Sequence, residues 1–100
     1  MNQVPTVPAE DWEAWASERN ALLLDIREEH EWTLGILPGA TLIAMSELVQ
    51  RIEELPRDRP ILCVCRSGSR SHQVAAYLMH LGFEEVANMT GGMKALGMQD

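Results

Sequence analysis

Continuous apolar runs that recur along the chain are the feature that most constrains its fold. Three runs are clear, ALLLDI (21–26), ATLIA (40–44) and PILCVC (60–65), and EEVANM (84–89) is a weaker fourth. Apolar residues in these runs follow one another without alternating with polar ones, so both faces of each strand must be buried, as in a parallel sheet. A short strand over residues 4–7 is a candidate fifth.

Segments with the spacing of helices separate these runs. Pro8 can open a first helix, Ser46 is a favourable N-cap for a second helix over residues 46–55, and Gly82 can end a third helix that follows residues 65–71. The apolar side chains of each helix recur at a spacing that places them on one inward face. They are Trp12, Trp15 and Ala16 in the first helix, Leu48, Val49, Ile52 and Leu55 in the second, and Val74, Ala75, Leu78 and Leu81 in the third.

The alternation of strands and helices predicts an α/β fold, with a central, mostly parallel sheet of four to five strands and helices on both faces. The 100 residues contain no linker and no internal repeat, so we expect a single domain over residues 1–100. Ligand sites in such sheets form at the carboxyl ends of the strands. Cys65 would be the last residue of the third run and would lie at that edge.

Charge and cysteine content argue against several classes of protein. The formal net charge is −7, from 15 acidic residues and 8 lysines and arginines, which disfavours nonspecific binding to nucleic acid or to anionic membranes. No apolar run approaches the roughly 20 residues that a membrane-spanning helix needs, and the N-terminal residues lack the pattern of a signal peptide. Cys63 and Cys65 are too close and too few for a disulfide framework. We therefore expect a cytoplasmic protein with no nucleic-acid or membrane partner.

The segment CRSGSRS (65–71) combines a thiol with groups that favour its thiolate form. A helix N-terminus and nearby cations lower the pKa of a cysteine, and Cys65 would have both, the cations being Arg66 and Arg70. Gly68 permits the backbone to curl so that its N–H groups surround an anion. Hydroxyl donors are added by Ser67, Ser69 and Ser71. The pattern predicts a nucleophilic sulfur at the base of an anion-binding cup, and the alternative is a polar turn with an unreactive thiol.

This segment resembles the active-site loop of rhodanese-like sulfurtransferases, and the resemblance extends over nearly the whole chain. LLDIREEHEW (23–32) resembles the family's strand that ends in Asp-x-Arg, followed by a glutamate-rich helix. GILPGATLI (35–43) resembles its Gly-His-Ile-Pro-Gly-Ala segment, and GGMKAL (91–96) resembles its closing Gly-Gly-x-x-Ala-Trp. The order and spacing of these motifs imply a small, one-domain member of the family.

The chain departs from the family pattern at two places. Ile36 and Leu37 stand where the family has His-Ile, so that histidine is missing, and Leu96 stands where the family usually has tryptophan. Neither place holds the candidate nucleophile. We interpret both departures as changes in packing and loop anchoring, which affect stability and rate more than the type of reaction.

The resemblance implies sulfur transfer through a persulfide on Cys65. The thiolate would take a sulfane sulfur from thiosulfate or a persulfide donor and pass it to a thiol, a protein acceptor or cyanide, without a cofactor or a metal. Backbone N–H groups of residues 66–70 would stabilise the persulfide anion, and Arg66 and Arg70 would attract the anionic donor. Asp25 and Arg27, which the resemblance places near the loop, are expected to form a structural ion pair or loop anchor rather than to act in catalysis.

Several alternatives stay open at this point. The strongest is a non-catalytic rhodanese-type binding or regulatory module. Phosphatases and arsenate reductases of related fold have five residues between cysteine and arginine, as the family resemblance implies, whereas four residues separate Cys65 from Arg70. The Cys-Val-Cys spacing is wrong for a zinc site. A redox role for Cys63 is less favoured than its burial as a small apolar side chain.

Other conspicuous side chains receive structural interpretations. His30, His72 and His80 are expected on helix surfaces. The tryptophans are expected in core or rim packing. Glu28, Glu29 and Glu31 are expected to form a solvated helix face near the positive end of a helix dipole.

Overall fold

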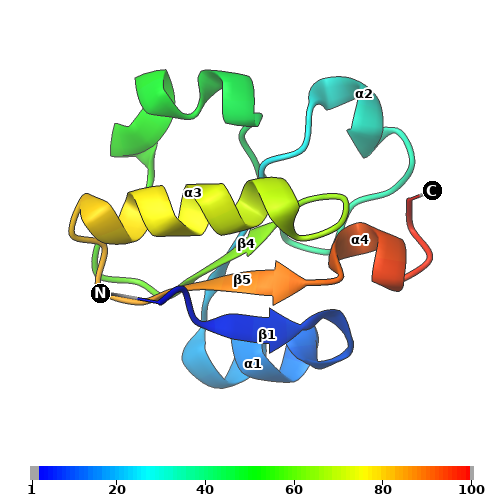
Figure 1. Cartoon of the computed structure of the whole chain (residues 1–100), viewed down its shortest axis with the longest axis horizontal. Coiled ribbons are helices and arrows are strands. Elements are labelled where there is room, and N and C mark those ends of the chain that lie inside the picture. The colour runs from blue at the N-terminus through cyan, green and yellow to red at the C-terminus, as the bar shows by residue number, and fades with distance from the viewer. Residues whose placement is uncertain (1–2, 100) are drawn as a thin grey trace.

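The computed structural model describes residues 3–99, which form a five-stranded sheet with every pair of neighbouring strands parallel (Figure 1). The order across the sheet is β1-β5-β4-β2-β3. The predicted parallel sheet is confirmed, and its fifth strand lies at residues 6–8 rather than 4–7. The strands are β1 (Thr6–Pro8), β2 (Leu22–Asp25), β3 (Thr41–Leu42), β4 (Ile61–Val64) and β5 (Val86–Thr90).

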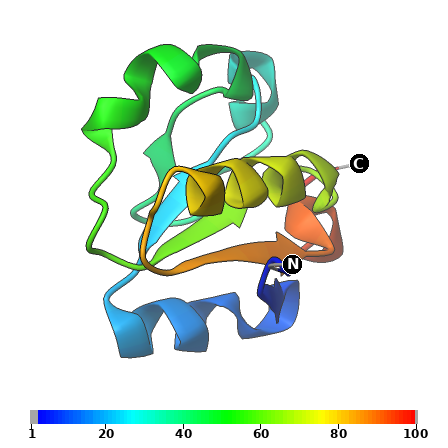
Figure 2. The same cartoon turned by 60° about the vertical axis from the view of Figure 1, so that its left-hand side comes forward.

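Helices cover both faces of this sheet, as predicted. Figure 2 shows α3 on one side and α1 on the other, and the two apolar cores lie between these helices and the strands. The first predicted helix is a 3₁₀ turn, η1, that continues into α1. The helices are η1 (Ala9–Asp11), α1 (Trp12–Arg19), α2 (Glu29–Trp32), η2 (Met45–Glu47), η3 (Val49–Glu54), α3 (Ser69–His80) and α4 (Gly92–Ala95).

Strands β2 and β4 supply side chains to both cores. In the register of this pair, Leu23 lies beside Leu62 and Leu24 lies beside Cys63. Leu23 and Leu62 belong to the core on the α1 side, whereas Leu24 and Cys63 belong to the core under α3. Because successive residues of a strand point to opposite faces, a strand that is buried on both faces needs a continuous apolar run.

The segment predicted as one α-helix over residues 46–55 consists instead of the two short 3₁₀-helices η2 and η3. Ser46 is not an N-cap, because it lies within η2, and its hydroxyl donates to the carboxylate of Glu28 at 2.8 Å. Leu48 and Leu55 are buried as predicted, but Val49 is 66% exposed. A 3₁₀-helix has about 3.0 residues per turn rather than 3.6. Leu48 lies between η2 and η3 and points into the core, whereas Val49 opens η3 and faces solvent.

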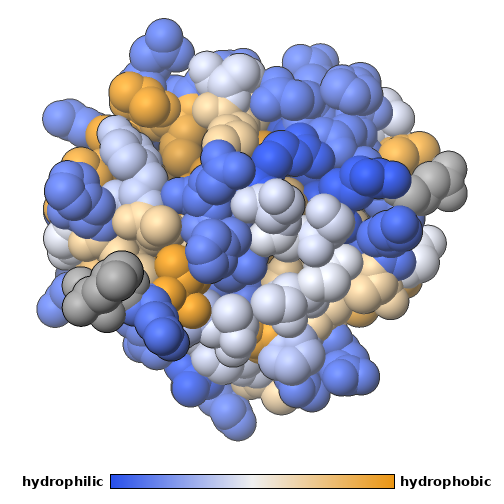
Figure 3. Space-filling view, in the orientation of Figure 1, coloured by the Kyte–Doolittle hydropathy of each residue, from blue (hydrophilic) through white to orange (hydrophobic). Residues whose placement is uncertain are grey.

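Helix α3 is close to its prediction. It begins at Ser69 rather than near Ser71, and it buries the predicted apolar stripe except for Leu81, which is partly buried. Gly82 follows its last turn with a φ of 92°, a left-handed conformation that suits glycine at a helix end. Hydrophilic residues cover much of the surface over α2, and residues near the middle of the hydropathy scale lie over the start of α3 (Figure 3). None of the helices formed by residues 3–99 has the length and apolarity to cross a bilayer.

Helix α4 packs against the start of the loop that follows β4. The backbone N–H groups of Met93 and Lys94 donate to the carbonyl oxygens of Cys65 and Arg66, each at 2.9 Å. Gly92 makes this close approach possible, since a Cβ atom there would overlap the carbonyl group of Arg66. The second glycine of the GGMKAL segment therefore has a packing role at the loop.

Gly92→Ala is expected to destabilise the protein much more than Gly97→Ala. Both glycines have a positive φ, 60° and 73°, so both substitutions carry the cost of a left-handed alanine, about 1 kcal/mol. Only Gly92→Ala adds an overlap, because a Cβ at Gly97 meets nothing within 4 Å. Thermal unfolding measures the difference, and equal losses in Tm would contradict the tight packing of α4.

Candidate active site

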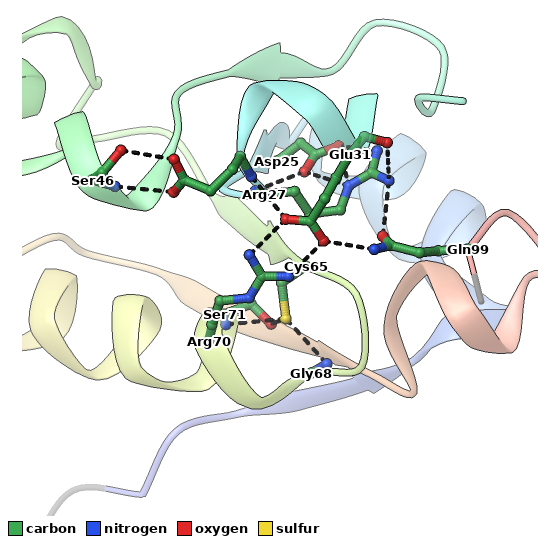
Figure 4. A network of polar contacts seen from close by, with 10 residues as sticks. Asp25, Arg27, Glu31, Ser46, Cys65, Gly68, Arg70, Ser71 and Gln99 are labelled. Atoms are coloured by element: carbon green, nitrogen blue, oxygen red, sulfur yellow. Dashed lines mark hydrogen bonds and ion pairs between the residues drawn. The ribbon is translucent and has the colours of Figure 1, made fainter. Parts of the chain in front are cut away.

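Cys65 directly follows β4, and its buried sulfur lies inside the turn that leads into α3 (Figure 4). The backbone N–H groups of Gly68 and Ser71 donate to Sγ at 3.1 and 3.3 Å. The hydroxyl oxygen of Ser71 lies 3.2 Å from the same sulfur. Gly68 has a φ of 102°, which curls the loop so that N–H groups face inward. The loop is therefore a small cup with a sulfur at its base.

Opposing influences act on the pKa of Cys65. Burial raises the pKa, because removal from water disfavours the charged thiolate. Hydrogen bonds from the side chain of Ser71 and from the backbone N–H groups of Ser71, Gly68 and Ser67 lower the pKa, and the lowering prevails. Fixed dipoles of the loop thus stabilise the thiolate.

Cys63 lies in a different environment although it is only two residues away. It is fully buried in the core under α3. Burial, and secondarily the neighbouring Cys65, raises the pKa of its thiol far above the ordinary value. The interpretation of Cys63 as a buried apolar side chain is confirmed, and its thiol stays protonated at neutral pH.

Arg70 is held by a carboxylate that the sequence analysis did not place at the site. Two nitrogens of its guanidinium each lie 2.8 Å from an oxygen of Glu31 (Figure 4). Glu31 is only 7% exposed, so the expected solvated face of Glu28, Glu29 and Glu31 is wrong for Glu31. The hydrogen bond from Arg70 is the main reason that the pKa of Glu31 falls to about 2. The positive charge of Arg70 is therefore compensated within the protein.

Helix α2 positions Glu31 through a capping box. Glu28 is the N-cap, and its backbone N–H donates to the Glu31 carboxylate at 2.9 Å. Gln99, near the C-terminus, donates to the other oxygen of that carboxylate at 2.6 Å. Because α2, α3 and the C-terminal segment all donate to it, Glu31 is fixed beside the loop.

Asp25 and Arg27 form a buried ion pair at the end of β2. Arg27 donates from Nη2 to Asp25 at 2.7 Å, and both side chains are almost fully buried. The same guanidinium donates to the carbonyl oxygens of Gly35 and Glu31, at 2.7 and 3.2 Å. The pair therefore holds the chain that leaves α2, and with it the position of Glu31.

The other predicted site residues divide between the surface and the interior. Arg66, Ser67 and Ser69 are exposed, whereas Ser71 is fully buried. Asn88 of β5 is a residue that the sequence analysis missed. Its side chain accepts a hydrogen bond from the Ser71 hydroxyl and donates to the Gly68 carbonyl at 3.0 Å. The available signal was a polar residue inside an otherwise apolar strand.

The remaining interpretations concern side chains away from the cup. His30, His72 and His80 are exposed on helices, as expected. Of the two departures from the family pattern, Ile36 is 42% exposed and Leu37 is buried, while Leu96 packs at the edge of the core on the α1 side. In the part of the chain that the structure describes, no group of three or more histidine, cysteine or carboxylate side chains is arranged to hold a metal ion.

Glu31→Gln is expected to remove much of the acid sensitivity of the fold. The folded-state pKa of Glu31, about 2, lies below its ordinary value of 4.5, so the carboxylate stabilises the fold above pH 4.5. This stability is lost as the pH falls toward 2 and amounts to at most about 3 kcal/mol. The free energy of unfolding, measured between neutral and acidic pH, should fall less in Glu31→Gln than in the wild type. Glu29→Gln, at an exposed position, is the control, and identical pH profiles for all three proteins would contradict this role.

Comparison with known proteins identifies the family. Residues 8–99 match the rhodanese-like domain family. A sulfurtransferase of Allochromatium vinosum is 41% identical over 80 residues, which are 80% of this chain and 75% of that protein. A thiosulfate sulfurtransferase GlpE of Vibrio cholerae is 34% identical over 83% of this chain and 78% of its own length.

Similarity extends to a protein with another activity and to solved structures. A tRNA uridine(34) hydroxylase of Chlamydia pneumoniae is 30% identical over 97% of this chain, which spans only 32% of that protein. The crystal structure of a rhodanese-like domain protein from Staphylococcus aureus superposes with a TM-score of 0.84 and 26% identity, over 92% of this chain and 90% of that one. With the parallel sheet and the curled cysteine loop, these matches show that the chain belongs to the rhodanese-like domain family, which includes proteins named sulfurtransferases.

Proposed function

We propose that the protein is a sulfurtransferase in which Cys65 carries the transferred sulfur as a persulfide. The observation that carries this proposal is the convergence of the Gly68 and Ser71 backbone N–H groups on one buried sulfur, which the Ser71 hydroxyl also contacts. Such donors favour the thiolate without a separate general base. Relatives named sulfurtransferase and thiosulfate sulfurtransferase support the same class of reaction.

The reaction has two half-steps that share the same sulfur atom. Sγ of the thiolate attacks the outer sulfur of thiosulfate, and the bond between that sulfur and the sulfonate sulfur breaks, so that sulfite leaves with the bonding pair. The resulting persulfide carries its negative charge on the outer sulfur. An acceptor thiolate or cyanide then attacks the outer sulfur, and the bonding pair returns to Sγ of Cys65.

The surroundings of Cys65 bear on which molecules would react. The side chain is fully buried, which favours small reagents such as thiosulfate or a low-molecular-weight persulfide. Backbone N–H groups of residues 66–70 would stabilise the charge on the outer sulfur. Arg66 lies at the exposed rim and would attract an anionic donor. The charge of Arg70 is compensated by Glu31. Both cysteines are free thiols, which suits the reducing cytoplasm that we propose as the compartment.

Incubation with thiosulfate is expected to add one sulfur atom to Cys65. After removal of the donor, the intact mass of the wild type should rise by one sulfur, and cyanide should release it. Cys63→Ala should behave like the wild type, since Cys63 is buried with a raised pKa. Cys65→Ser should gain no sulfur.

Two results would contradict this proposal. Addition of sulfur that survives Cys65→Ser would place the carrier elsewhere. No addition to any variant, with thiosulfate or with a persulfide donor such as glutathione persulfide, would support the non-catalytic binding module instead.

A further inference from the structure

A buried chain of polar groups connects β5 with Cys65, and the two half-steps do not use all of it. Asn88 is 3% exposed, and Ser71 is fully buried. The amide of Asn88 donates from Nδ2 to the Gly68 carbonyl at 3.0 Å. Its Oδ1 lies 2.5 Å from Oγ of Ser71, which in turn lies 3.2 Å from Sγ of Cys65. The chain of contacts therefore runs from amide to hydroxyl to sulfur.

The carbonyl of Gly68 fixes the orientation of this amide. A carbonyl oxygen can only accept a hydrogen bond, so Nδ2 of Asn88 must face it and Oδ1 must face Ser71. Oδ1 also can only accept. The hydroxyl of Ser71 has a single proton, and it therefore donates either to Asn88 or to Sγ of Cys65.

The protonation state of Cys65 changes which of these bonds is favoured. When Cys65 is a thiol, its S–H donates to Oγ of Ser71, the hydroxyl donates to Asn88, and every group has a partner. When Cys65 is a thiolate, the sulfur is the stronger acceptor and attracts the hydroxyl proton. The buried Oδ1 of Asn88 then loses its donor, which costs free energy.

We propose that Asn88 is a positioning residue that limits how strongly Ser71 holds Cys65 as a thiolate, by competing for the hydroxyl proton of Ser71. This inference rests on the proposed function, in which Cys65 is the nucleophile. Once Sγ is bonded to the transferred sulfur and the charge lies on the outer sulfur, Sγ is a weak acceptor and the hydroxyl donates to Asn88 again. The proton stays on Ser71 throughout, and only the direction of its hydrogen bond changes. Asn88 thereby favours the loaded persulfide over the empty thiolate.

Charged and titratable groups around Cys65 come from several elements, and the variants below leave all of them in place. The strand that carries Asn88, VANMT, contributes none. The groups are Cys63 of β4, Arg66 of the loop, Arg70 of α3, Glu28 and Glu31 beside Arg70, and the Asp25–Arg27 pair at the end of β2. Helix α4 meets the loop through backbone groups, and its Lys94 is exposed.

Asn88→Leu tests the competition, because it keeps the approximate size of the side chain and removes both polar atoms. The readout is the rate at which iodoacetamide alkylates Cys65 as a function of pH. We expect the midpoint of the profile to fall, with a rate below that midpoint about fivefold higher, the factor that corresponds to one hydrogen bond. Ser71→Ala should move the midpoint the other way, because the sulfur loses a donor.

The double variant separates this role from a structural one. In the Ser71→Ala background, Asn88→Leu should leave the alkylation profile unchanged, since no hydroxyl proton remains to compete for. If Asn88 acted only by holding the Gly68 carbonyl, the substitution would shift the profile equally in both backgrounds, and the proposal would be overturned.

A measurement on the wild type covers the case in which Asn88→Leu fails to fold, as judged by circular dichroism. The chemical shift of the Asn88 side-chain amide, followed by NMR, should change with the same pH midpoint as Cys65 alkylation. A chemical shift that does not change around this midpoint would overturn the proposal.

The persulfide assay distinguishes this inference from the proposed function. At a fixed ratio of thiosulfate to sulfite, the ratio of loaded to empty Cys65 should fall about fivefold in folded Asn88→Leu, and an unchanged ratio would overturn the preference for the persulfide. Absence of persulfide from every variant, together with the expected alkylation profiles, would overturn the sulfurtransferase function and support the control of the thiolate by Asn88.

Discussion

A buried sulfur needs hydrogen bonds from the loop that surrounds it, and this requirement organises the site. The N–H groups of Gly68 and Ser71 point toward the sulfur. As a consequence, carbonyl groups of the same loop point away from it. Three of these carbonyls meet donors from other elements, those of Cys65 and Arg66 from α4 and that of Gly68 from Asn88. Because buried backbone groups need partners, α4 and β5 are as necessary to the cup as the sequence of the loop itself.

The order of the strands brings these partners together. Strand β5 lies on one side of β4 and carries Asn88, whose register partner is Cys63, two residues before Cys65. Strand β2 lies on the other side, and the chain that leaves it forms α2 and delivers Glu31 to Arg70. The carboxyl ends of parallel strands lie at the same edge of the sheet. Segments that are far apart in sequence therefore reach the cysteine loop from both sides.

The strands and the position of Cys65 were predictable from local sequence. A strand that is buried on both faces has a continuous apolar run, and this run ends where the strand ends. The environment of Glu31 was not predictable in this way. Its partner, Arg70, is 39 residues away, and its sequence neighbours are typical of a solvated helix. The same holds for Asn88, which is 17 residues from Ser71. The failure at residues 46–55 has a different cause, since one apolar spacing is compatible with both α and 3₁₀ winding over so short a segment.

Compensation of Arg70 by Glu31 affects how the proposed reaction would select a donor. The protein carries a net charge of −7, so a dianion such as thiosulfate gains no long-range attraction, and charges more than about 8 Å away are screened at physiological ionic strength. Glu31 also offsets the charge of Arg70. The backbone N–H groups are not offset in this way, because the conformation of the loop fixes their direction and they act at contact. In the proposed reaction, selection would then depend on the fit of a terminal sulfur at the base of the cup more than on the total charge of its carrier. Singly charged persulfides would be on equal terms with thiosulfate.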